Sequence, residues 1–254
     1  DSVEVAIKDG TGKAVRHLKL PATLGLNRMV WQLESDGTRF PLTPKPKAET
    51  PPTPGIFVSP GTYTAHISYG AFSDSQQVKI LSDPRRKVDM AGVEQWHKSA
   101  EAYFDMVGSV TLSADILRDA RERMIIVDKL VSDQVKDTAA KNRYDEKRKA
   151  IGKEIDSLMA KLTAPEDAQG IYEDPAQLMQ KLQSVAFYLD PASGSPNPPA
   201  GPPPSTFGMA MQNVKVDADK FNLSVLKWKQ TTWVLFEEVV KGLKLDLLRP
   251  LGVD

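Results

Sequence analysis

The spacing of apolar residues changes once along this chain, and that change limits the folds open to it. Before about residue 82, apolar and polar residues alternate, which is typical of strands with one buried face. From about residue 88, apolar residues recur every three or four positions, which is typical of helices with one buried stripe. The sequence therefore predicts an α+β, multidomain chain with strands first and helices afterwards.

Two segments of the first part have matching apolar faces. Met29, Trp31 and Leu33 fall on one side of an extended segment over 25–33, and Tyr63 to Tyr69 alternate in the same way. We expect these segments to be the middle strands of a small sandwich. Trp31 is expected at the centre of its core, because a mid-strand tryptophan buries a large area.

The remaining signals of the first part complete this prediction. A hairpin over 3–20 turns at residues 9–12, and a last strand covers 74–81. Residues 40–60 hold seven of the 19 prolines, so we expect an extended connection there, because proline lacks the backbone donor that a central strand needs. These features predict an Ig-like antiparallel β-sandwich over 1–82, followed by a linker over 83–88.

The rest of the chain, 89–254, is predicted to form an up-down bundle of about four long helices. The first runs over about 88–132, with Gly108 as the expected point of a bend. The others follow Asp137, Asp174 and Ser205, and a proline-rich loop over 191–204 is expected to be solvated. The apolar stripe of the last helix consists of Phe221, Val225, Trp228, Leu235, Phe236, Val239 and Leu243, and it leaves Trp233 outside.

Three passages near the start, 5–16, 25–33 and 60–64, resemble the Ig-like domain family of the bacterial flagellar hook-capping protein. Asp83-Pro84-Arg85 and the helical segment after it are similar to the C-terminal region of bacterial secreted sortilin-like proteins with BNR-repeat β-propellers, often labelled glycosyl hydrolases. Gln32 departs from the aspartate usual there. The resemblance implies a propeller upstream, which would hold any hydrolytic site, and a secreted, periplasmic or cell-surface location in a bacterium. The start at Asp1, without a leader, also leads us to expect a processed piece.

Composition argues against several functions. The chain has 33 basic and 33 acidic residues, so no net charge attracts nucleic acid, and no apolar run is long enough for a membrane span. It has no cysteine, and its three histidines lie on separate predicted elements. We therefore predict no metal site and no cofactor.

The acidic and basic clusters are also explained without a catalytic or ligand-binding role. Glu237-Glu238, Asp217 with Asp219, and Glu166-Asp167 are interpreted as solvated helix or loop charges rather than a glycosidase pair. The basic stretch over 141–149 contains acidic residues at helical spacing and is interpreted as an exposed helix face. The sequence thus predicts no catalytic residue and no enzyme activity for these 254 residues.

Three aromatic residues are the candidates for a contact surface. Tyr69 and Phe72 flank a predicted turn, and Trp233 lies off its helix stripe. The function predicted is a non-catalytic structural or assembly module of a larger exported protein, which positions a propeller or holds subunits together. Its expected partners are its own upstream domain, other subunits or a second copy of the chain. The alternative is an accessory carbohydrate-binding module, with a glycan as partner.

Overall fold

The computed structural model describes residues 2–47, 50–163, 177–189 and 199–246. It shows the predicted α+β class, with antiparallel sheets and helices of which one is long. The chain forms two compact units: unit 1 comprises residues 1–108 and 183–212, and unit 2 comprises 109–182 and 213–254. Unit 1 thus combines the strands with the start of the long helix, and the predicted limits at 82 and 88 stay a prediction.

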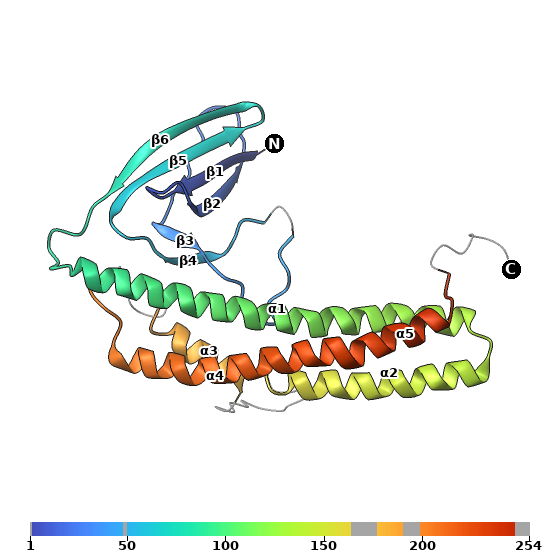
Figure 1. Ribbon diagram of the computed structural model, residues 1–254. Helices are drawn as coiled ribbons and strands as arrows, with labels where there is room; N and C mark the ends of the chain where they lie inside the picture. The colour runs from blue at the N-terminus through green and yellow to red at the C-terminus, as the bar shows by residue number, and fades with distance from the viewer. Residues whose placement is uncertain (1, 48–49, 164–176, 190–198, 247–254) are drawn as a thin grey trace, which may run out of the picture. The chain divides into compact units, whose positions relative to one another are not determined.

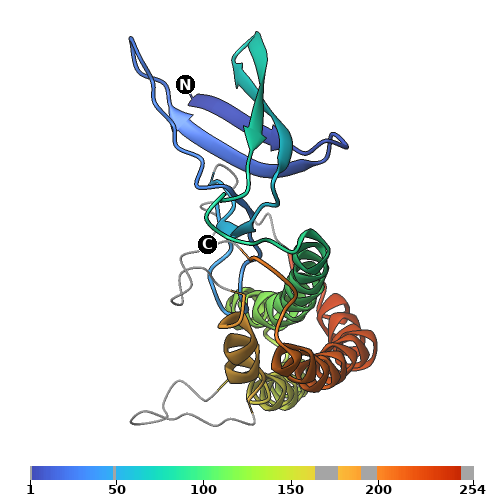
Figure 2. The same cartoon turned by 90° about the vertical axis from the view of Figure 1, so that its left-hand side faces the viewer.

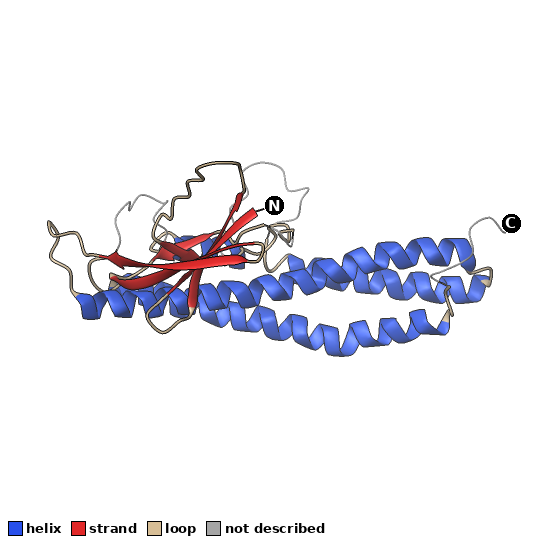
Figure 3. Cartoon of the chain, turned by 90° about the horizontal axis from the view of Figure 1, so that it is seen from above, coloured by secondary structure: helices blue, strands red, loops and turns tan. Residues whose placement is uncertain are grey.

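Four antiparallel strands form the main sheet of unit 1 (Figure 1, Figure 3). They are β1 (Ser2–Lys8), β2 (Ala14–Pro21), β5 (Gly61–Tyr69) and β6 (Phe72–Ile80), in the order β2-β1-β5-β6. The hairpin predicted over 3–20 is confirmed. Its turn is held by the Asp9 carboxylate, which accepts hydrogen bonds from the Thr11 and Lys13 amides.

The prediction that Trp31 lies in a middle strand is wrong. Residues 22–33 form no strand, and pairing begins only with β3 (Glu34–Asp36). Gly25 and Leu33 both have positive φ, which interrupts an extended conformation at each end of the segment. Trp31 is half-buried rather than at the centre of the core: its indole N–H donates to the Glu34 carbonyl at 2.8 Å, and its ring packs edge-on against Tyr63 with 5.6 Å between centroids.

The proline-rich connection over 40–60 contains a strand that was not predicted. β4 (Pro54–Phe57) pairs with β3 in a separate two-stranded sheet. Pro54 is its first residue, a position where the missing donor is tolerated. The buried Arg16 of β2 joins this sheet to the main one, because its guanidinium donates to the carbonyl oxygens of Pro52 and Thr53 at 3.0 Å and to the Asp36 carboxylate at 3.3 Å.

The long helix is confirmed as α1 (Met90–Gln134), which is helical throughout 45 residues, Gly108 included. It begins in unit 1 and continues into unit 2 after Gly108. Its apolar residues at three-and-four spacing are buried: they are Val93, Trp96, Ala100, Tyr103, Val107, Val110, Ala114 and Leu117. The three-and-four spacing therefore identified the buried face correctly.

Part of the loop over 191–204 packs on α1 inside unit 1, although it was expected to be solvated. Gly92 lies so close to Pro202 that a Cβ added at Gly92 would be 2.3 Å from the proline Cδ. The Asp89 amide donates to the Ala200 carbonyl at 2.9 Å. Residues 190–198 lie outside the described part of the chain.

Unit 2 consists of helices side by side (Figure 2). They are the second part of α1, α2 (Thr138–Met159), the start of α3 (Leu178–Ala186), most of α4 (Ser205–Trp228), and α5 (Val234–Gly242). Helix α2 follows Asp137 as predicted, and the Asp137 carboxylate caps it by accepting from the Ala139 amide at 2.9 Å. The predicted cap at Asp174 lies outside the described residues.

Polar contacts join the helices of unit 2. The Asn222 side chain of α4 bridges Ser109 and Ser113 of α1, at 3.0 and 2.7 Å. The Asp128 carboxylate of α1 accepts from Tyr144 and Arg148 of α2, at 2.6 and 3.0 Å. Because buried polar groups need partners, these bonds fix which helix faces meet.

A π-helical turn corrects the stripe predicted for the last helix. The turn η2 (Lys229–Trp233) lies between α4 and α5. A π turn takes up about one residue more than an α turn, so the residues after it are rotated relative to those before it. Trp233 is consequently buried, at 9% exposed, whereas Leu235, predicted on the stripe, is 59% exposed.

Candidate functional site

Tyr69 and Phe72 lie where β5 turns into β6. They are directly opposite each other in the strand register, and Gly70 and Ala71 form the turn between them. Gly70 has φ of 57°, the left-handed conformation that a tight hairpin requires at its first turn position. Tyr69 is 43% exposed and Phe72 is 77% exposed. The exposure expected at this turn is therefore present.

Two further apolar side chains share their face of the sheet. Side chains of a strand alternate between faces, and opposite residues of antiparallel strands point to the same side. Ile67 is two residues from Tyr69 on β5, and Val78 lies opposite Tyr63. Both are exposed. We call Ile67, Tyr69, Phe72 and Val78, together with the outer edge of β6, the β5–β6 surface.

The end of this sheet face that is far from Phe72 is covered, because Tyr63, near the start of β5, is buried. Apolar residues on this face are expected for that reason. Tyr63 is buried against Trp31, and Ile7 and Ile56 are buried with it in unit 1. Arg16 is held there by the β3–β4 region, through its bonds to Asp36 and to two backbone carbonyl groups. The small second sheet is thus too short to cover the end that carries Phe72.

Strand β6 is the last strand of the sheet (Figure 1). It pairs with β5 along all nine of its residues without a register shift. Eight of the nine residues are exposed. In the part of the chain that the structure describes, no backbone hydrogen bond from another strand reaches its outer side.

The opposite face of the sheet carries a groove of about 240 Å³ with a mixed polar and apolar lining. His17 and His66 both line it, and both lie beside Ala6 in the strand register. Each imidazole uses Nδ1 for a partner: the Asp36 carboxylate is 2.5 Å from His17, and the Ser75 hydroxyl is 2.8 Å from His66. Alternation within each strand could not predict that these histidines align, because their alignment depends on β1 lying between β2 and β5.

The third histidine is elsewhere. His97 is on α1, partly buried, and burial lowers its pKa, an effect that the nearby Glu101 partly opposes. Among the described residues, no group of three or more histidine or acidic side chains is placed to hold a metal ion.

Trp233 belongs to unit 2 and lies inside it. Its ring packs against Trp228 and Phe236, with centroids 5.8 and 5.3 Å away, and its N–H donates to Glu237 at 2.8 Å. Little of its surface is left for a partner. It is therefore not included in the β5–β6 surface.

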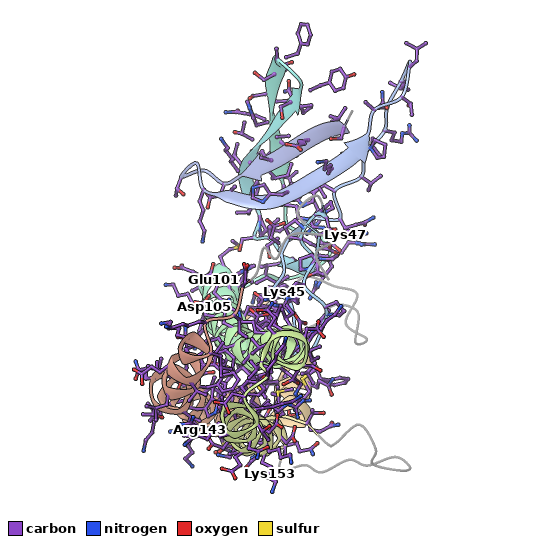
Figure 4. All side chains as sticks on the ribbon, turned by 90° about the vertical axis from the view of Figure 1, so that its right-hand side faces the viewer. Lys45, Lys47, Glu101, Asp105, Arg143 and Lys153 are labelled. Atoms are coloured by element: carbon purple, nitrogen blue, oxygen red, sulfur yellow. The ribbon has the colours of Figure 1, made fainter. Side chains whose placement is uncertain are left out.

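The charged clusters have ordinary ion pairs where they are described. Asp217 pairs with Lys181 at 2.5 Å, and Asp219 pairs with Lys215 at 2.9 Å. On α2, Arg143 and Lys153 are both exposed, and Lys153 points away from the other helices (Figure 4). Glu166-Asp167 lies outside the described residues. These contacts favour solvated helix faces over an acid pair or a phosphate site.

No family model, curated protein or solved structure matches this chain. Among the described helices, none combines the length and apolar character needed to cross a membrane. The candidate site therefore rests on the geometry of the β5–β6 surface.

Proposed function

We propose that this chain is a non-catalytic structural module that makes protein–protein contacts through the β5–β6 surface. The observation that carries the proposal is the exposure of three neighbouring apolar side chains on one sheet face, Ile67, Tyr69 and Phe72. Val78 is exposed farther along β6, beyond Asp74 and Gln76. Exposed apolar side chains that cluster in this way are typical of interaction sites, because covering them releases water. A half-covered sheet also offers a flat face of the kind on which another protein layer packs.

We further propose the finer architecture that this function needs, an Ig-like sandwich and an up-down helical bundle. The packing of Trp31, which precedes β3, on Tyr63 of β5 supports a sandwich. The bonds of Asn222 to Ser109 and Ser113 support a bundle. The resemblance to secreted sortilin-like proteins supports an exported bacterial protein, in which the partner is the upstream domain or another subunit.

Photochemical cross-linking tests the contact directly. Phe72→p-benzoylphenylalanine places a reactive ketone at the most exposed ring of the surface. On irradiation in cells that produce the protein, we expect an adduct with a polypeptide, which mass spectrometry identifies. The control is Lys13→p-benzoylphenylalanine, at an exposed position of the β1–β2 turn. An absence of polypeptide adducts at residue 72, or equal adducts at both positions, would contradict the proposal.

A glycan is the second candidate partner, since Tyr69 and Phe72 are aromatic neighbours on one face. Sugar rings stack on exposed aromatic side chains, so a carbohydrate-binding module would lose affinity when the rings are removed. Glycan-array binding that disappears in the Tyr69→Ala/Phe72→Ala double variant would favour this function. Binding that is absent, or unchanged in the variant, would leave the protein contact as the function.

A further inference from the structure

The outer side of β6 has a defined set of backbone groups that pair with no other strand in the described part of the chain. Tyr69 and Phe72 close a two-residue turn, so they form a hydrogen-bonded pair, and such pairs alternate along an antiparallel ladder. Asp74, Gln76 and Val78 therefore bond to β5. Ser73, Ser75, Gln77 and Lys79 then direct their N–H and C=O groups away from β5.

One hydrogen bond of the strand agrees with this assignment. The Ser75 amide donates to the side chain of Asp74 at 2.7 Å, so it is not used by β5. The outward amide is thus satisfied locally by a surface carboxylate, which a neighbouring strand can replace.

The strand lacks two of the features that normally protect an edge. Sheet edges are usually blocked by proline, by bulges, by charged side chains or by a covering segment. The β6 sequence has no proline and its register with β5 has no bulge, while its charged residues are limited to Asp74, opposite Ile67, and Lys79. The opposite edge of the sheet is different, because β2 is engaged by Asp36 through the Arg16 guanidinium and the His17 amide.

We propose that β6 pairs antiparallel with β6 of a second copy of this chain, with Gln76 on the two-fold axis. This inference rests on the proposed function and names the partner. In this register Ser73 and Ser75 of one copy form hydrogen-bonded pairs with Lys79 and Gln77 of the other. A two-fold axis joins identical patches and closes the assembly at two chains, the commonest form of oligomer.

The strand is self-complementary in that register. All nine residues pair, whereas a shift of two residues in either direction leaves two of them unpaired. Phe72 of one copy faces Ile80 of the other, an aromatic and β-branched pair of the kind that stabilises sheets. Asp74 faces Val78 and Lys79 faces Ser73, so no like charges are opposed. A register shifted by one residue is excluded, because it would pair outward groups with groups already bonded to β5.

Single cysteines test the register, because the chain has no other thiol. Residues opposite in a non-hydrogen-bonded pair have Cα atoms about 4.5 Å apart, which a disulfide can span. Under mild oxidation we expect Gln76→Cys to form a cross-linked dimer at least about tenfold faster than Ser75→Cys or Gln77→Cys. Those two variants are matched controls, since they would react fastest in the registers shifted by two residues.

Charge variants at the axis provide the second test. Gln76→Lys places two lysines directly opposite each other, and we expect the dimer seen for the wild type by sedimentation to be lost. Gln76→Glu should be monomeric for the same reason, and an equal mixture of the two variants should dimerise again. Residue 76 is exposed, so an unchanged thermal unfolding midpoint will show that both variants fold.

Three results would overturn the pairing. The wild-type chain could sediment as a monomer at high concentration, or Gln76→Cys could cross-link no faster than Ser75→Cys and Gln77→Cys. The third result is a mixture of Gln76→Lys and Gln76→Glu that stays monomeric. The cross-linking at Phe72 separates this failure from that of the proposed function. Adducts only with a different protein would leave the contact module standing and exclude the dimer. An absence of any polypeptide adduct would remove both.

Discussion

The imidazole of His97 lies in an environment that disfavours its protonated form. Its Nε2 is buried and has no hydrogen-bond partner within the described residues. The ring packs edge-on against Trp96, 5.2 Å between centroids. Because a protonated imidazole would lose its hydration there, burial holds the pKa of His97 below its ordinary value of 6.5, although Glu101 opposes the shift.

This environment predicts a pH dependence of stability. In the unfolded chain, His97 takes up a proton as the pH falls through about 6.5, whereas in the folded chain it resists protonation. The unfolded state thus binds more protons, and the free energy of unfolding should fall between about pH 7 and about pH 5. Urea unfolding should show a smaller fall in His97→Gln, which has no titrating ring.

A comparison at about pH 8 separates this effect from packing, because the imidazole is neutral there in both states. Any difference between wild type and His97→Gln at that pH comes from lost contacts. Equal pH slopes in the two proteins would show that His97 does not contribute to the dependence.

At the scale of elements, the π turn η2 decides which aromatic rings enter the core of unit 2. Trp233 packs on Trp228 and Phe236, and Phe236 packs on Tyr144 with 5.8 Å between centroids. Without the extra residue of the turn, the stripe would place Leu235 inside instead. The turn therefore replaces a leucine with a tryptophan in the core.

Two alanine variants test this register of the last helix. Trp233→Ala removes a buried ring, and we expect it to lower the free energy of unfolding by about 3 to 5 kcal/mol. Leu235→Ala removes an exposed side chain, and we expect a change within about 0.5 kcal/mol. Urea unfolding followed by circular dichroism measures both. If Leu235→Ala lowers the free energy of unfolding more than Trp233→Ala does, the last helix is instead an uninterrupted α-helix with Leu235 in the core.

Local periodicity explains which elements were predictable. Alternation over seven to nine residues identified β1 and β5, and the three-and-four spacing identified α1 and α2, because each pattern repeats several times within one element. Strands β3 and β4 have three and four residues, too few for a pattern to repeat. The π turn has no sequence signal of its own, so the exchange of Leu235 for Trp233 could not be foreseen.

The candidate site was predictable in part for the same reason. A turn at Gly70 is a local signal, and it correctly marked Tyr69 and Phe72 as exposed. Two other features follow from strand order: β6 lies at the edge of the sheet, and His17 and His66 both flank Ala6. Strand order depends on which distant segments pair, and alternation within one segment says nothing about it.

At the scale of the whole molecule, charge neither drives nor opposes association. The formal net charge at pH 7 is zero, so two copies do not repel each other as a whole. The proposed β6 pairing adds backbone hydrogen bonds and apolar contacts, and it opposes no like charges. Its strength should therefore depend little on ionic screening.

This gives a prediction that separates the β6 dimer from association through charged helix faces. At pH 7, we expect the dissociation constant from sedimentation equilibrium to change by less than about threefold between about 0.05 M and about 0.5 M NaCl. Contacts through the ion-paired faces of α2 or α4 would instead weaken steeply with salt, because exposed charge pairs are screened. If Gln76→Lys still associates and its association weakens steeply with salt, the contact is on the helices. If the dimer is insensitive to salt and Gln76→Lys abolishes it, the contact is at the edge of β6.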